Sequence, residues 1–272
     1  MLKGHRTSTT PAGSLIKGGP STVRNLIRPV PPTLAAPKAR LNSGKCADKM
    51  PLTIEGPDGA AADQVLAGVW QLAERVETQV AESLRTLADA DLESADVVVH
   101  ADQEVNRLRY QVEEWVTAEL ASGVGEERLR LLIAVLYVIA DLERIGDHAE
   151  GIARVALMLG RPPMRSLPAS VLQLGAMVRT MLSGGVAVLR DRDVEAARLL
   201  VGEDDAIDRL YDDVYGELIA TMTAQPDTVV PCTYQLWATH NLERIADRVT
   251  NLCERTVYLG TGRIEDLNIS TY

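Results

Sequence analysis

The chain has 272 residues and a formal net charge of −10, which is unevenly divided along the sequence. Residues 1–50 carry nine Lys and Arg against one acidic residue, which leaves 19 basic and 37 acidic residues in the remainder. So acidic a body argues against a nucleic-acid partner, because nucleic acids attract basic surfaces. Three cysteines without a C-x-x-C spacing exclude a disulfide framework and indicate a reducing compartment.

Residues 1–58 have the composition of a basic extension rather than of a folded domain. Pro, Gly, Ser and Thr are frequent, and apolar residues do not recur at helical spacing. Because such a segment cannot bury enough apolar surface to fold alone, we predict that it is disordered. The longest apolar run of the chain, residues 131–140, is half of the roughly 20 residues that span a bilayer. The sequence therefore predicts a cytoplasmic protein without a transmembrane helix.

From residue 59 onward, apolar residues recur at spacings of three and four, the period of an amphipathic α-helix. Clusters of Gly, Pro, Ser and Asp interrupt this pattern and mark the connections. Between the interruptions the pattern predicts six helices, over residues 61–89, 92–121, 126–159, 168–190, 193–224 and 228–260. Two adjacent glycines inside the fourth helix, Gly184 and Gly185, indicate a bend or the close approach of another helix.

The last three predicted helices repeat the first three. The stretch DLERIGDH, which begins at Asp141, returns as NLERIADR at Asn241, one hundred positions later. A weaker match aligns the second helix with the fifth at an offset of 102 residues. With connections this short, the repeat predicts an all-α fold of two tandem, pseudo-symmetric, antiparallel three-helix bundles. We expect residues 59–161 to form the first bundle and residues 166–266 to form the second.

Each copy of the repeated stretch contains a Glu and an Asp four residues apart, Glu143 with Asp147 and Glu243 with Asp247. On a helix this spacing places both carboxylates on one face, about 40° apart. Apolar residues upstream share the same face, so the carboxylates continue a packing stripe. A carboxylate in that position needs a cation, an arginine partner or water to offset its desolvation.

A second pair of polar side chains lies on the middle helix of each half. Asp102 and Asn106 form this pair in the first half, and Asp204 and Asp208 form it in the second. If the neighbouring helices pack with these turns level, four oxygen-bearing side chains converge in each half. Hard and borderline divalent cations prefer such oxygen ligands, so the pattern indicates two metal sites.

Two other interpretations remain open. The acidic residues could pair with arginines in a helical scaffold that binds no metal. Arg144 and Arg244 point about 100° away from the Glu residues that they follow, so we expect other arginines in that role. Alternatively, the carboxylates bridge two metal ions in an enzyme, although the Glu-x-x-His motif of such helical enzymes is missing.

For the histidine and aromatic side chains of the helices we predict structural roles and no chemical function. We expect His148 to be a partly exposed, hydrogen-bonding residue. The aromatic residues in apolar phases of the helices are expected in the core. They are Trp70, Trp115, Trp237, Tyr110, Tyr211 and Tyr215.

The combined features resemble the PhoU family of phosphate-uptake regulators. LERIGDHAEGIA from Leu142 and LERIADRVTNLCERTVYLGTG from Leu242 carry the resemblance, which extends over residues 61–266. It implies two pseudo-symmetric three-helix bundles in a cytoplasmic, non-enzymatic protein that is often a homodimer. It also implies that the chain restrains the phosphate ABC transporter, through its ATPase subunit, and the sensor histidine kinase of the phosphate-starvation response.

The resemblance also implies bound metal, because some family members bind metal through E/D-x-x-x-D pairs. The expected ions are divalent or ferric: iron, manganese, magnesium or zinc. The ligands carried over are Asp102, Asn106, Glu143 and Asp147 in the first half, and Asp204, Asp208, Glu243, Asp247, Asn251 and Glu254 in the second. The first half departs from the pattern, with Gly151 and Arg154 in place of Asn251 and Glu254. The resemblance therefore implies a more complete metal site in the second half.

Overall fold

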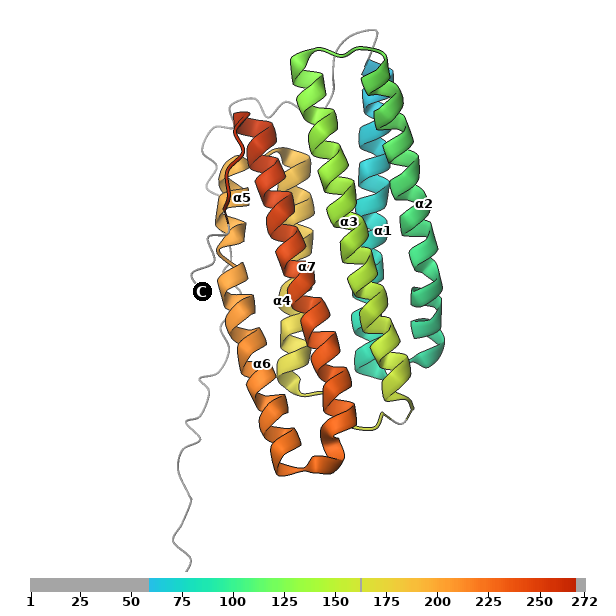
Figure 1. Ribbon diagram of the computed structural model, residues 1–272, viewed down its shortest axis with the longest axis vertical. Helices are drawn as coiled ribbons and strands as arrows, with labels where there is room; N and C mark the ends of the chain where they lie inside the picture. Colours follow the sequence, from blue (N-terminus) through green and yellow to red (C-terminus); the bar gives the residue numbers. More distant parts are fainter. Residues whose placement is uncertain (1–58, 162, 268–272) are drawn as a thin grey trace, which may run out of the picture. The chain divides into compact units, whose positions relative to one another are not determined.

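The computed structural model, drawn in Figure 1, describes residues 59–161 and 163–267. These residues form helices and connections without a strand, so the prediction of an all-α fold is confirmed. In chain order the elements are α1 (Gly59–Asp89), α2 (Leu92–Ala121), α3 (Glu126–Leu159), α4 (Ala169–Asp191), α5 (Val194–Val201), α6 (Asp204–Ala224), the short 3-10 helix η1 (Pro226–Thr228) and α7 (Val229–Thr261). The predicted disorder of residues 1–58 lies outside the described residues.

Both halves begin their second helix with the same cap. The side chain of Asp91 accepts a hydrogen bond from the backbone N–H of Ser94 at 3.2 Å, before α2. Asp193 accepts from the N–H of Ala196 at 3.1 Å, before α5. A carboxylate at this position satisfies a backbone donor that the first turn leaves unpaired. The Ser94 hydrogen bonds, with help from Arg85, lower the pKa of Asp91 to about 2. The sequence repeat is thus reproduced in local structure.

The predicted fifth helix, residues 193–224, is in fact two helices, α5 and α6. The break lies at Gly202, whose N–H bonds the carbonyl of Leu199 three residues back at 3.2 Å, in the manner of a 3-10 turn. Glycine costs about 1 kcal/mol relative to alanine inside a helix. The first half has His100 at the equivalent position, and α2 is continuous there. The second half therefore starts a new helix at Asp204, one of the predicted ligands.

The two halves meet where α3 packs against α7, and these helices run in opposite directions (Figure 1). Asp141 of α3 contacts Arg248 of α7, while Asn241 of α7 contacts His148 of α3. Equivalent positions thus meet each other's counterparts, as they do at a two-fold interface between identical subunits. On the outer sides, α1 and α2 pack on α3, and α4, α5 and α6 pack on α7.

Besides two smaller clusters within the second half, one large hydrophobic core runs through both halves. It includes Leu132 and Leu142 of α3, Leu182 of α4 and Leu242 of α7, all of them almost fully buried. The helices of each half lie within the ranges expected from the repeat, and all of these described helices belong to one compact unit. The halves are therefore repeats of one fold that share an interior.

The two adjacent glycines of α4 mark a close helix contact, as predicted. A Cβ atom placed on Gly185 would lie 2.5 Å from Cγ1 of Val249 on α7. One placed on Gly184 would lie 3.1 Å from Cδ2 of Leu200. Real Cβ atoms do not approach carbon atoms as closely as 2.5 Å, so α4 and α7 can pack at this distance only because residue 185 has no side chain.

One of the described helices, α4, is long and apolar enough to cross a bilayer by length and composition alone. None was expected from the sequence. However, Leu174, Val178 and Leu182 of this helix are buried in the shared core. A central helix of a bundle has the same composition as a membrane span, because both are surrounded by apolar groups.

The expectation that the aromatic residues lie in the core is wrong for three of them. Trp237, Tyr110 and Tyr215 have exposed fractions of 51%, 56% and 47%. Tyr110 and Trp237 each lie five residues from a buried residue, Val105 and Leu242, which is about 140° around the helix, so these two positions were wrongly assigned to an apolar phase. By contrast, Trp70 is partly buried, and the guanidinium of Arg190 lies over its ring at 5.1 Å from the centroid.

Candidate functional site

The first carboxylate cluster lies where α2 faces α3. Asp102 of α2 has an exposed fraction of only 9% and points at Gly146 of α3, on the turn between Glu143 and Asp147. A Cβ atom on Gly146 would lie 3.5 Å from the Oδ1 atom of Asp102 and 3.0 Å from Val105. The distance to Asp102 is an ordinary van der Waals contact, so the glycine of LERIGD mainly leaves room for Val105 and for Gln79, whose Oε1 would lie 3.3 Å away. The two helices pack level, as predicted.

Both oxygens of Asp102 accept hydrogen bonds from amides. Nδ2 of Asn106 donates to Oδ2 at 2.8 Å, and Nε2 of Gln79 on α1 donates to Oδ1 at 3.4 Å. Burial is the main reason that the pKa of Asp102 is raised, and these amides oppose the rise. Gln79 was not predicted, although this buried polar residue in the apolar stripe of α1 was a signal that could have revealed it.

The arginine of the signature reaches the acidic residues on its own helix. Nη1 of Arg144 lies 3.1 Å from Oδ2 of Asp147, and its Nε lies 3.6 Å from Oε2 of Glu143. In the second half, Nη1 of Arg244 lies 2.8 Å from Oδ2 of Asp247. The expectation that these arginines point away was wrong, because it considered the Cα–Cβ direction and ignored the long side chain, which bends back across one turn.

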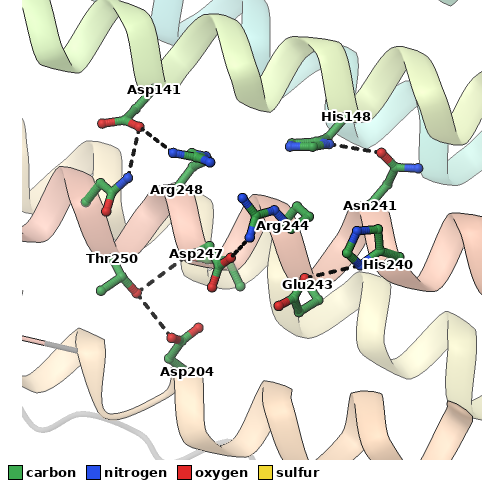
Figure 2. A network of polar contacts seen from close by, with 12 residues as sticks. Asp141, His148, Asp204, His240, Asn241, Glu243, Arg244, Asp247, Arg248 and Thr250 are labelled. Carbon is green, nitrogen blue, oxygen red and sulfur yellow. Dashed lines mark hydrogen bonds and ion pairs between the residues drawn. The ribbon is translucent and has the colours of Figure 1, made fainter. Parts of the chain in front are cut away.

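The second cluster lies where α6 faces α7 (Figure 2). Asp204 at the start of α6 has an exposed fraction of 4%, and its Oδ2 accepts a hydrogen bond from Oγ1 of Thr250 at 3.4 Å. Glu243 lies about two turns before Thr250 on α7. The Oε2 atom of Glu243 is buried without a hydrogen-bond partner among the described residues. Nδ1 of His240 lies 3.5 Å from the same oxygen, an ion pair only when the histidine is protonated.

Burial and neighbouring negative charge raise the pKa values of Asp204, Asp208 and Glu243 in the second cluster. Burial, followed by the charges of Asp208 and Asp247, raises the pKa of Asp204 to about 6. Burial and the charge of Asp247 raise the pKa of Glu243 to about 7, against the opposing effect of Arg244. The pKa of Asp208 is also raised, by burial and then by Asp247. Such shifts mark negative charges held together with too little positive charge around them.

The fit to a metal ion is partial. Within the ranges 59–161 and 163–267, no three His, Cys, Asp or Glu side chains meet at the spacing of a metal site. The chemistry of the donors is nevertheless suitable in the second half. Four carboxylates act on one another there, and one buried oxygen of Glu243 lacks a hydrogen bond. Rotation of these side chains about their own torsions would be needed to gather their oxygens on one ion.

Two of the predicted ligands have other partners in the structure. Nδ2 of Asn251 donates to Oδ1 of Asp141 on α3 at 3.0 Å. Oε1 of Glu254 accepts from the backbone N–H of Leu267 at 3.1 Å and so anchors the segment after α7. As placed, neither side chain belongs to the carboxylate cluster of the second half.

A set of polar contacts between α3 and α7, which we call the seam, was not predicted from the sequence: Asp141, His148, Asn241, Arg248 and Asn251. Nη1 of Arg248 lies 3.5 Å from Oδ1 of Asp141, and Nδ1 of His148 lies 2.9 Å from Oδ1 of Asn241 (Figure 2). His148 is partly exposed and hydrogen-bonded, as predicted. The signal was available, since the repeat begins with a polar residue at 141 and 241 before the apolar leucine of each copy.

We expect replacement of Asp141 by alanine to lower the free energy of unfolding by about 1–3 kcal/mol, because Arg248 and Asn251 both lose their acceptor in a partly buried setting. Chemical denaturation of the single variants and of Asp141→Ala combined with Asn251→Ala would give the coupling energy. The matched control is Asn241→Ala, which removes a neutral hydrogen bond from the equivalent position. Strictly additive effects of Asp141→Ala and Asn251→Ala would contradict the contact.

Comparison with known proteins gives the same fold and the same repeat. The PhoU domain profile matches residues 69–156 and again residues 171–256. The chain is 30% identical to the phosphate-specific transport system accessory protein PhoU homolog of Clostridium acetobutylicum, over 71% of this chain and 89% of that protein. It is 31% identical to the homolog of Streptococcus pneumoniae serotype 4, over 76% of this chain and 94% of that protein.

Solved structures agree with these sequence comparisons. The structure superimposes on the crystal structure of PhoU from Pseudomonas aeruginosa with a TM-score of 0.73 and 28% identity, over 76% of this chain and all of that one. The corresponding values for the phosphate transport system regulatory protein PhoU from Streptococcus pneumoniae are 0.70 and 28%, over 75% and 97% of the two chains. The two PhoU domain matches fall on the two helical halves described above, one on each, and the chain belongs to the PhoU family.

Proposed function

We propose that this protein is a non-enzymatic regulator of phosphate uptake and of phosphate-starvation signalling. The observation that carries the proposal is the pair of PhoU domain matches, one in each helical half. The relatives are named as accessory or regulatory proteins of phosphate transport and not as enzymes. Regulation by contact is compatible with a molecule made of long helices, whose outer faces present side chains at fixed spacing.

The partners that we propose are the ATPase subunit of a phosphate ABC transporter and a phosphate-responsive sensor histidine kinase. Both would be restrained when phosphate is abundant, so the protein would act as a negative regulator. We further propose that it works in the cytoplasm as a homodimer. Relatives that are accessory to a phosphate-specific transport system support the first partner.

We also propose that the second cluster, formed by Asp204, Asp208, Glu243 and Asp247, binds a divalent or ferric ion such as iron, manganese, magnesium or zinc. The support is the burial of these carboxylates beside one another: burial first, and then the neighbouring charges, raise the pKa values of Asp204 and Glu243, and Oε2 of Glu243 is buried without a hydrogen-bond partner among the described residues. A cation would neutralise that charge and tie α6 to α7. The ion pair between Arg244 and Asp247 supports the alternative, a scaffold that binds no metal.

Deletion of the gene tests the regulatory proposal. A reporter of the phosphate-starvation response should become active in phosphate-replete medium, and expression of the full chain from a plasmid should restore repression. Unchanged repression after deletion would reject the proposal. The purified, iron-loaded protein should consume no dioxygen, because consumption would instead support the carboxylate-bridged di-metal enzyme.

A further inference from the structure

The two carboxylate clusters have diverged on the helices that face the repeated stretch. At the offset of 102 residues, residues 102–110 of α2 correspond to residues 204–212 of α6. Three positions are neutral in the first half and acidic in the second: Gln103, Asn106 and Tyr110 against Asp205, Asp208 and Asp212. At a fourth position the basic Arg109 corresponds to the neutral Tyr211, and at a fifth the acidic Glu104 corresponds to the neutral Ala206. The first of these segments therefore has no net charge, and the second has a net charge of −3.

The acidic side chains of the first cluster already have protein donors. Gln79 and Asn106 donate to the two oxygens of Asp102, and Arg144 reaches the two carboxylates on its own helix. One turn further on, Nη2 of Arg154 lies 2.6 Å from Oε1 of Glu150. A metal ion would have to displace these donors and leave buried amides unpaired, which costs free energy. The residues of the first half therefore do not fit the metal that the family resemblance implies.

The second cluster lacks two of these neutralising features. The two PhoU domain matches begin at residues 69 and 171, again 102 positions apart, so Gln79 corresponds to Met181 of α4, which is 2% exposed and whose side chain has no N–H to donate. Asn106 corresponds to Asp208, so an amide donor is replaced by another acceptor. Asp205 and Asp212 add further negative charge, which acts on Asp208. The second cluster thus combines more negative charge with fewer donors at the equivalent positions.

We infer that the first half has lost the cation site that its sequence signature implies, and that cations bound by this chain are held by the second half. The acidic residues of the first half serve instead as polar sets with protein partners, because Asp102 joins α2 to α1 through Gln79 and the acidic residues of α3 pair with Arg144 and Arg154. This inference rests on the proposed cation binding and extends it, because it assigns the two equivalent positions different roles.

Manganese binding to matched variants tests the inference. We suggest equilibrium dialysis of the full, chelator-treated chain against Mn²⁺ alone, with the bound metal measured by elemental analysis. Glu243→Gln and Asp208→Asn should each weaken Mn²⁺ binding roughly tenfold or more, because each removes a ligand charge. Glu143→Gln, the same change at the equivalent position, should leave Mn²⁺ binding within about twofold of wild type, a difference of less than about half a kcal/mol. Asp208→Asn copies the amide found at Asn106, so it is compatible with the fold, and circular dichroism would verify folding.

Each outcome decides the question. Equal losses in Glu143→Gln and Glu243→Gln would show that both halves bind the cation and would overturn the inference. A wild-type chain that binds no Mn²⁺ would also overturn it, together with the proposed metal site. Neither result bears on phosphate regulation, which the deletion experiment tests separately through its own reporter.

Discussion

Replacement of Gly185 by valine should lower the free energy of unfolding by about 3 kcal/mol, because a side chain here must be placed in a fully packed contact between α4 and α7. Even the first carbon of that side chain would lie 2.5 Å from Cγ1 of Val249. Val249 is itself completely buried, and a β-branched side chain in a helix has one preferred rotamer. It therefore cannot turn aside, and α4 must shift from α7.

The same substitution at Gly216 is the matched control. Gly216 lies within α6, and a Cβ atom there would have no heavy atom within 4 Å. We expect Gly216→Val to change the free energy of unfolding by no more than about 0.5 kcal/mol, since it only exchanges helix propensities. Denaturant midpoints of both variants give the comparison. Val249→Ala should partly rescue Gly185→Val. If both glycine variants unfolded like wild type, the close approach of α4 to α7 would be refuted.

The second cluster should make the protein less stable as the pH rises from about 5 to about 8 in the presence of a chelator. The pKa values of Asp204 and Glu243 are raised to about 6 and about 7, so the folded state binds more protons than the unfolded state in this range. Stability therefore falls as pH rises through these values and is greatest where both groups are protonated. A tenfold difference in proton affinity between the folded and unfolded states corresponds to about 1.4 kcal/mol, so a loss on the order of 3 kcal/mol is expected for this coupled pair.

Two variants distinguish the contribution of the second cluster to this pH dependence from that of the other acidic residues. Glu243→Gln keeps the shape of the side chain without its charge, so it should raise stability at pH 8 and flatten the pH profile. Glu114→Gln, an exposed change within α2, should leave the profile as in wild type. Melting curves with chelator across this pH range measure both effects. A wild-type profile that rises with pH between 5 and 8 would contradict the raised pKa values.

The helical fold was predictable from sequence because the residues that decide it act locally. Spacings of three and four define the helices, and glycine and proline define their ends. The repeat of LERI-x-D then indicated two equivalent halves. The main error in the predicted helices was to continue the fifth helix through Gly202, where the structure has a break. A single glycine lowers helix stability by about 1 kcal/mol, which the surrounding packing can either tolerate or convert into a break.

The sequence predicted where the acidic side chains lie on their helices, but it did not predict which side chains they contact. Helical phase placed Glu143 and Asp147 on one face, and the structure puts Asp102 beside them. Phase did not show that Arg144 would bend back across its own turn, nor that Gln79 would reach Asp102 from a third helix. Such contacts depend on side-chain torsions and on the distance between helices, which a single sequence does not encode at any fixed spacing.

The antiparallel meeting of α3 and α7 has a consequence for how the two halves can change. When identical subunits meet about a two-fold axis, every substitution is made twice, so a favourable change on one side is accompanied by its copy on the other. Here both sides are encoded separately in one polypeptide. Asp141 can face Asn251 and Arg248 at one end of the interface, while Asn241 faces His148 at the other. Covalent fusion therefore removes the constraint of symmetry and lets duplicated positions specialise independently.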